Sequence, residues 1–163
     1  MTVTDVDVWR REILEVSHIV QDDDVSVPAS EAEARVERFA ELMEQVNGTE
    51  NATVFATLLE CFHPQDDYGL YESLLGAVLR WPAAELGNLT ARFIGALIGY
   101  NADMAGNVLN QLARHDDAVV SFNATARALP PGDLDVLASF VATEHQQGWL
   151  DVDGVRGKLL AGS

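Results

Sequence analysis

Apolar residues recur along the chain at steps of three and four, the spacing that places them on one face of an α-helix. The first such run spans 7–20 and the second spans 30–46, where Ser30 and Glu33 match a capping box. The apolar stripe of the second run consists of Val36, Phe39, Leu42, Met43 and Val46. No stretch alternates apolar and polar residues between hairpin turns, so the sequence predicts an all-α protein without a sheet.

Between residues 49 and 147 the helical runs are separated by turns of only a few residues, which places consecutive helices antiparallel. We expect eight or nine helices in a single domain, 1–163. Within it, 1–48 forms an N-terminal helical cap, 49–147 forms stacked helix pairs and 148–163 forms a short C-terminal helix.

A faint internal repeat bears on how those pairs are arranged. Asn51-Ala52-Thr53 resembles Asn88-Leu89-Thr90, which lies 37 residues later. We expect a helix from about Thr49 in the first segment and a helix opened by Asn88 in the second. Each segment continues into an apolar helix, an acidic turn and a second apolar helix. A period in the high thirties is near that of HEAT-like and armadillo-like repeats. The sequence therefore favours a short HEAT-like stack, with a plain bundle of equal helices as the alternative.

The charge balance limits the partners. The chain has 10 Lys and Arg residues against 26 Asp and Glu residues, a formal net charge of −16. No basic surface is available to neutralise phosphates, so we expect neither a nucleic acid nor an anionic membrane as partner. A basic protein fits this charge, and acidic adaptation to a salty habitat is the other explanation.

The ends and the cysteine content point to a compartment. The first residues, Met1-Thr2-Val3-Thr4-Asp5, contain neither a basic region nor an apolar core, so we expect no secretory signal. Cys61 is the single cysteine, which excludes an internal disulfide and suits a reducing compartment. We therefore expect a cytoplasmic protein.

Candidate chemistry centres on His115-Asp116, the dipeptide typical of metal-dependent phosphohydrolases, with His63 and Asp133 as possible further ligands. Both histidines fall at predicted helix junctions, where a cap explains an Asp and the helix dipole explains a His. Cys61 falls on a predicted buried face, which is typical of an inert cysteine. We expect no enzyme activity, no metal and no cofactor, and we keep a small metal-dependent hydrolase as an alternative.

Acidic residues gather at turns and helix starts in doublets, which exceeds the one cap that each helix needs. Tyrosines lie in the same segments, and aromatic anchors beside charge are typical of protein interfaces. Two acidic turns, Asp66-Asp67 and Asp103, are expected on one edge of the stack. The predicted partner-binding residues are Asp66, Asp67, Tyr71, Glu72, Asp103, Asp116 and Asp117.

Three segments carry a family resemblance. They are Phe62-His63-Pro64 through Tyr71-Glu72-Ser73-Leu74-Leu75, then Ala102-Asp103-Met104-Ala105 with Val108-Leu109-Asn110, and finally Leu129-Pro130-Pro131. Together they are similar to bacterial immunity proteins of polymorphic-toxin and contact-dependent inhibition systems. The resemblance implies a cytoplasmic helical protein, a monomer or weak dimer, that binds and blocks a cognate toxin, commonly a nuclease, without catalysis. A generic acidic helical-repeat adaptor is the alternative binding protein.

Overall fold

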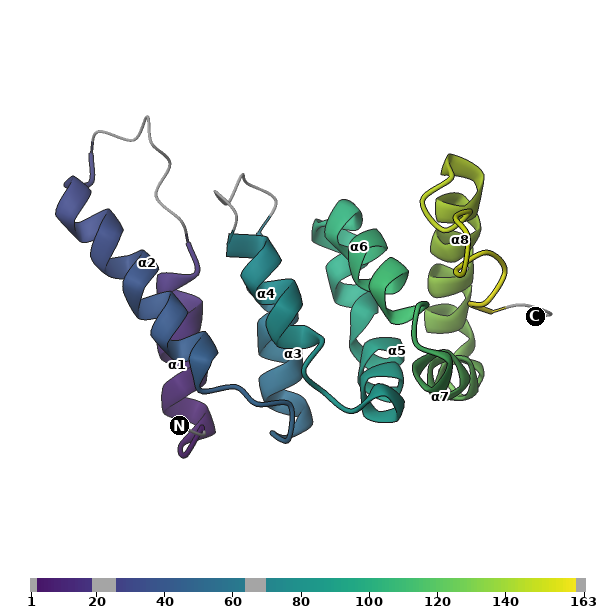
Figure 1. Cartoon of the computed structure of the whole chain (residues 1–163), viewed down its shortest axis with the longest axis horizontal. Helices are drawn as coiled ribbons and strands as arrows, with labels where there is room; N and C mark the ends of the chain where they lie inside the picture. The colour runs from purple at the N-terminus through teal and green to yellow at the C-terminus, as the bar shows by residue number, and fades with distance from the viewer. Residues whose placement is uncertain (1–2, 19–25, 64–69, 161–163) are drawn as a thin grey trace. The chain divides into compact units, whose positions relative to one another are not determined.

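The computed structural model describes residues 3–18, 26–63 and 70–160. These residues form eight α-helices and no strand, which confirms the all-α prediction (Figure 1). None of these helices is both long and apolar enough to cross a membrane. The helices are α1 Val6–Val16, α2 Ala29–Glu44, α3 Ala52–Glu60, α4 Leu70–Val78, α5 Ala83–Tyr100, α6 Ala102–Leu112, α7 Asp116–Arg127 and α8 Pro131–Gln147.

The chain divides into two compact units, residues 1–80 and 81–163. The boundary between the units follows Arg80. The expected single domain with a cap over 1–48 stays a prediction. In the first unit α1 packs on both α2 and α3, and α3 packs on α4. Consecutive helices run in opposite directions there (Figure 1).

Polar side chains join the helices of the first unit. The Trp9 indole donates to the carbonyl of Leu42 at 3.0 Å, which links α1 to the end of α2. Arg80 donates from its guanidinium to the carbonyls of Met43, at 3.0 Å, and of Val46. The last turn of α2 carries no basic residue of its own. Arg80 therefore supplies the positive charge that stabilises this helix end.

The second unit is organised around α5, which packs most extensively on α7 and also contacts α6 and α8. Gly87 makes the close approach to α7 possible. A Cβ at this position would lie 2.1 Å from the carbonyl oxygen of Ala118 and 2.8 Å from the amide nitrogen of Phe122. Since real Cβ atoms do not approach that closely, the two helix backbones can meet here only because residue 87 has no side chain.

Two helix starts differ from the sequence prediction. Helix α2 begins at Ala29 after Pro28, without a side-chain cap, so the capping box at Ser30 is wrong. Asn51 caps α3 with its side chain, whereas Asn88 lies inside α5, which begins at Ala83 after Pro82. The 37-residue echo therefore does not join equivalent positions. Proline fixes φ near the helical value and starts both helices without a polar cap.

The C-terminal segment 148–160 forms turns, so the short helix expected there is wrong. Gly148 ends α8 with a φ of 88°, in the left-handed region. Gly154 and Gly157 have φ values of 82° and 67°, which a right-handed helix does not contain. The segment is nevertheless packed, because Leu150, Val155, Leu159 and Leu160 are all buried. Asn123 of α7 fixes it by donating to the Lys158 carbonyl at 2.8 Å and accepting from the Leu160 amide at 2.7 Å.

Candidate protein-binding surface

The predicted binding residues of the first unit lie around the start of α4. Asp66 and Asp67 fall outside the described residues. Tyr71 is half-buried: its hydroxyl donates to the carbonyl of His63, and its ring meets the Phe62 ring edge-on at 5.5 Å. Tyr71 therefore ties α4 to the end of α3, which is a structural role. Glu72 is exposed in the first turn of α4.

The predicted residues of the second unit occupy the first turns of two helices. Asp103 is exposed at the start of α6, and Asp116 and Asp117 are exposed at the start of α7. Because α6 extends roughly 16 Å between those two points, they do not form one cluster. The edge expected to hold Asp103 together with Asp66 and Asp67 includes undescribed residues and stays a prediction.

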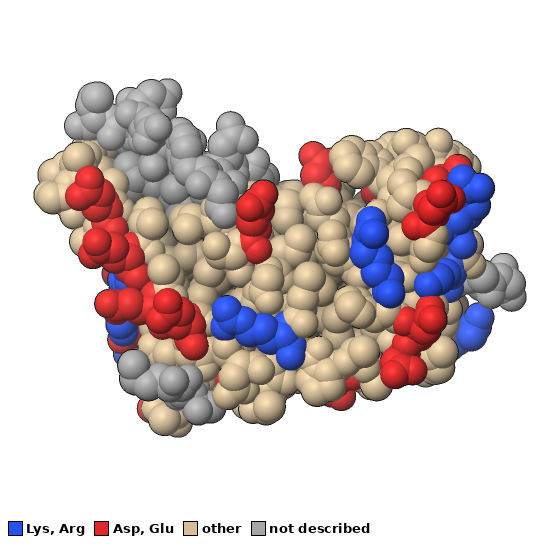
Figure 2. Space-filling model, viewed as in Figure 1, with Lys and Arg blue, Asp and Glu red and all other residues tan. Residues whose placement is uncertain are grey.

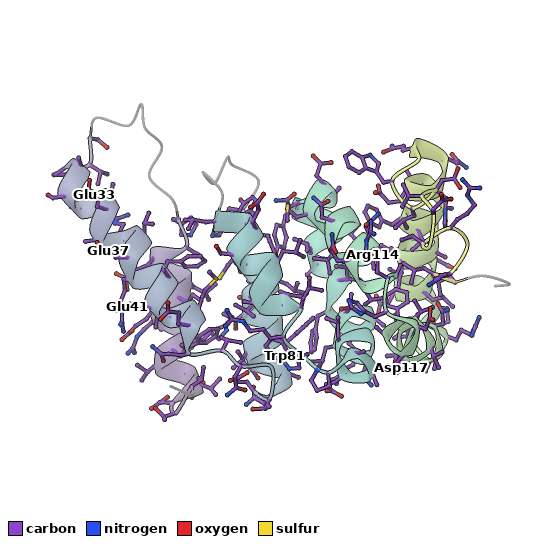
Figure 3. All side chains as sticks on the ribbon, viewed as in Figure 1. Glu33, Glu37, Glu41, Trp81, Arg114 and Asp117 are labelled. Carbon is purple, nitrogen blue, oxygen red and sulfur yellow. The ribbon has the colours of Figure 1, made fainter. Side chains whose placement is uncertain are left out.

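Asp116 and Asp117 differ in their partners. The Asp116 carboxylate accepts from the Lys158 ammonium at 2.7 Å. That hydrogen bond and the charge of Lys158 lower the pKa of Asp116 below its ordinary value. Asp116 thus holds the C-terminal segment against α7. Asp117, labelled in Figure 3, has no polar partner among the described residues and is free to meet another molecule.

The most continuous acidic surface of the first unit is one that the sequence analysis did not select. Glu33, Glu37 and Glu41 follow one another at four-residue steps along α2 and are all exposed (Figure 3). We call these three residues the acidic ridge. Carboxylates cover this length of α2 in the space-filling view (Figure 2). The i, i+4 spacing of three glutamates was the signal in the sequence that could have identified it.

The basic side chains of α2 pair with one residue of the acidic ridge, Glu41, and leave the other two unpaired. Arg35 pairs with Glu31 at 2.6 Å, and Arg38 pairs with Glu12 of α1 at 2.5 Å and with Glu41 at 2.8 Å. Glu33 and Glu37 have no ion pair or hydrogen bond among the described residues. Val36, expected in the core, is 38% exposed on the same helix. The surface therefore combines unpaired carboxylates with an apolar side chain.

A cluster of Ser17, His18, Cys61 and His63 joins the ends of α1 and α3. The Ser17 hydroxyl lies 2.9 Å from His63 Nε2 and 3.0 Å from the Leu14 carbonyl. The His18 and His63 rings stack at 4.1 Å. Burial and, to a smaller extent, the charge of His18 lower the pKa of His63. No spacing in the sequence indicated this cluster, because Ser17 and His63 meet only through the packing of α1 on α3.

This cluster is not arranged for nucleophilic chemistry. Ser17 is 2% exposed and Cys61 is 1% exposed, so a substrate cannot reach either atom. Burial raises the pKa of the Cys61 thiol to about 12, which keeps it protonated near neutral pH. Cys61 lies on a buried face, as predicted. Its environment is that of a structural cysteine.

The alternative metal site receives no support from the described part of the chain. No group of three or more His, Cys, Asp and Glu side chains that could hold a metal ion is found there. His115 is the exposed N-cap residue of α7, and Asp133 lies in the first turn of α8. Both residues have the helix-junction positions that the sequence indicates.

A buried carboxylate in the second unit was also missed. Glu144 of α8 is 8% exposed and has no hydrogen-bond partner for its carboxylate among the described residues. It packs into the space left by Gly106 of α6, where a Cβ would come within 2.5 Å of Glu144 Oε2. Burial and, secondarily, the charge of Asp103 raise the pKa of Glu144. Its helical register with buried Leu137 and Val141 was the available signal.

Comparisons of the chain with protein-family models, with curated proteins and with solved structures find no match. The surface chemistry of the described residues is therefore the basis for the functional conclusion.

Proposed function

We propose that this protein is a cytoplasmic, non-catalytic binding protein that neutralises a basic protein partner, as an immunity protein neutralises its toxin. The observation that carries the proposal is the acidic ridge, Glu33, Glu37 and Glu41, on a chain with a net charge of −16. Acidic surfaces raise the association rate with a cationic partner by long-range attraction.

The acidic ridge works against the stability of its own helix. Glu33 with Glu37, and Glu37 with Glu41, are like charges at i and i+4, each of which costs about 0.2–0.5 kcal/mol in a helix. Glu41 and Glu44 also place negative charge in the last turn of α2, where the helix dipole favours positive charge. Folding therefore does not require the acidic ridge, and binding supplies a reason for it.

An apolar strip beside the acidic ridge adds a contact that charge alone does not provide. Val36 and Ala40 lie one turn apart on α2 and are both exposed. In protein interfaces, charged rims mainly set the association rate, whereas packed apolar groups slow dissociation. Glu72, Asp103 and Asp117 are further exposed carboxylates that the proposal retains. Tyr71 and Asp116 have structural partners and are secondary candidates.

The experiment combines co-purification with the product of the neighbouring gene and survival of cells challenged with that product. The test variant is Glu33→Lys with Glu37→Lys. The matched control is Glu85→Lys with Asp153→Lys, which makes the same change in net charge at two exposed acids of the second unit that lack polar partners in the described residues. We expect the test variant to slow association by about tenfold or more at low salt and to reduce protection.

The control variant separates the acidic ridge from the overall charge. We expect it to associate within about twofold of the unmodified protein, since its charges lie elsewhere. Equal slowing of both variants would assign the effect to net charge alone. Unchanged association and survival in both would contradict the proposed role of the acidic ridge. A neighbouring gene product that never binds would contradict the proposed function.

A further inference from the structure

A surface groove lies between α5 and α8 of the second unit. Helix α5 packs far less on α8 than on α7, and two hollows of about 310 and 490 Å³ lie between the less closely packed helices. Val136 lines both hollows, which therefore adjoin, and we call the two together the α5–α8 groove. Its main lining residues are Arg92, Ile98, Asp133, Val136, Ser139 and Phe140.

The floor and wall of the groove on the α8 side are apolar. Ile94 and Leu137 are buried at its base, and Val136 is 53% exposed above them. The same side of α8 continues with Phe140, four residues after Val136, and with Thr143, three residues after Phe140. An exposed branched side chain beside a buried apolar base gives a second helix a surface on which to pack.

Helix α5 contributes one position without a side chain, Gly95, to the same groove. A Cβ at Gly95 would meet nothing within 4 Å, whereas a Cβ at Gly87 of the same helix would collide with the α7 backbone. Glycine inside a helix is destabilising relative to alanine. The packing of this unit requires glycine at Gly87, whereas Gly95 and Gly99 of the same helix are both open. Gly95 lines the groove, so an approaching backbone from another molecule has room there.

The charge around the groove selects the occupant. Asp133 and Asp135 lie on the α8 side of the hollows and have no ion-pair partner in the described residues. Arg92 on the α5 side is the single cation among the lining residues, so two carboxylates face one guanidinium and the lining is net negative. A second copy of this chain is disfavoured, because each copy carries a net charge of −16. A basic segment is favoured for the same reason. The α8 positions 133–143 extend roughly 15 Å, close to three turns of a helix.

We propose that the α5–α8 groove binds a basic amphipathic helix of the protein partner. The aliphatic face of that helix packs on Val136 and Phe140, its backbone approaches Gly95, and its lysines or arginines face Asp133 and Asp135. This inference rests on the proposed function in taking the partner to be basic. It adds a specific apolar site in the second unit to the charge attraction of the acidic ridge in the first.

The test uses the full chain and three labelled helical peptides of about 16 residues, with binding measured by fluorescence anisotropy. All three peptides share one Ala/Leu face, and their flanking positions are Lys, Gln or Glu. We expect the Lys peptide to bind most tightly and the Glu peptide not to bind. Binding of none of the peptides, or equal binding of all three, would overturn the proposal.

Matched valine variants locate the site. Val136→Glu places a carboxylate in the groove, whereas Val120→Glu makes the same change at a more exposed valine of α7, which is 70% exposed. We expect Val136→Glu to weaken binding of the Lys peptide by about tenfold, although it adds negative charge, and Val120→Glu to leave it unchanged. Equal effects of the two substitutions would overturn the assignment to the groove.

Gly95→Ala gives a second readout. It should raise the melting temperature, because alanine favours the helix, and still weaken peptide binding. A dimer of the unmodified protein in sedimentation that Val136→Glu dissociates would assign the groove to a second copy instead. Peptide binding is measured without the natural partner, so its failure is distinct from failure of the survival test. Retained peptide binding by Glu33→Lys with Glu37→Lys would confirm that the two surfaces are separate.

Discussion

The two compact units are both helical but join their helices by different interactions. In the first unit, charged and polar side chains reach from one helix to the next: Arg10 pairs with Glu60 at 2.9 Å, Arg38 pairs with Glu12, and Arg80 binds the end of α2. In the second unit, α5 meets α7 by direct backbone approach at Gly87. The described ion pairs there, Lys158–Asp116 and Arg156–Asp151, involve the C-terminal segment.

This difference predicts different sensitivities. Side-chain bridges between partly exposed groups are screened by salt and tolerate small changes in volume. A backbone contact is insensitive to salt but does not tolerate an added methyl group. The same contrast separates Gly87, where space is filled, from Gly95, where it is open. It follows that mutations should affect the two units in different ways.

The largest effect is expected at the helix contact of the second unit. Gly87→Ala should destabilise the protein by about 3 kcal/mol, because its methyl group would overlap the Ala118 carbonyl and neither backbone can move independently. Thermal unfolding followed by circular dichroism measures the loss. Gly95→Ala is the matched control, with an expected gain of about 0.5–1 kcal/mol. Equal behaviour of the two alanine variants would contradict the close approach of α5 and α7.

In the first unit, the largest single loss is expected at Arg80. Arg80→Ala removes the guanidinium that binds the Met43 and Val46 carbonyls and should cost about 1–2 kcal/mol in the free energy of unfolding. Urea denaturation at low and high salt measures it. Arg80→Lys keeps the charge with a different donor geometry and should recover part of the loss. A full loss in the lysine variant would assign the effect to the shape of the guanidinium alone.

Glu144 gives the second unit a pH-dependent element. Its folded-state pKa is raised above the ordinary value of 4.5, so the folded protein binds this proton more tightly than the unfolded chain. The free energy of unfolding should therefore increase as the pH falls through the raised pKa towards 4.5. Above the raised pKa the Glu144 carboxylate is charged, and its burial destabilises the folded protein by the full amount. Glu144→Gln should raise stability at pH 7 by about 1 kcal/mol or less.

The pH series provides the control for Glu144. The gain from Glu144→Gln should shrink as the pH is lowered, because protonation removes the same charge in the unmodified protein. Chemical denaturation at pH 7 and pH 5 compares the two proteins. A gain that is equal at both pH values would show that the substitution acts by packing against Gly106.

The smallest effect is expected for the exposed bridge between α1 and α3. A double-mutant cycle on Arg10→Ala and Glu60→Ala should give a coupling of about 0.2–1 kcal/mol, since both side chains are more than 40% exposed. The coupling should fall further in 1 M salt. A coupling that salt does not reduce would assign the contact to packing and would weaken the contrast between the units.

The sequence determined the helical class, because three-and-four periodicity records which side of each helix must leave water. The sequence also favours caps at Asn51 and Asn101, as the structure has them, since a short amide at a helix start accepts from the free backbone amides of the first turn. It failed at the starts of α2 and α5, where proline replaces a polar cap. In the segment after Asp151, turns bury Val155, Leu159 and Leu160, where the sequence predicted a short helix.

Tertiary structure decided which acidic and glycine positions have partners. Asp116 and Asp117 are adjacent in the sequence, yet Lys158, 42 residues from Asp116, pairs with the first and leaves the second exposed. Gly87 and Gly95 lie on one helix, yet the α7 backbone fills the space at the first alone. The periodicity of apolar residues indicates whether a side chain faces the core or solvent, because the direction of a side chain depends on the local helix geometry. The identity of the group it meets depends on contacts distant in the sequence, which local geometry does not specify.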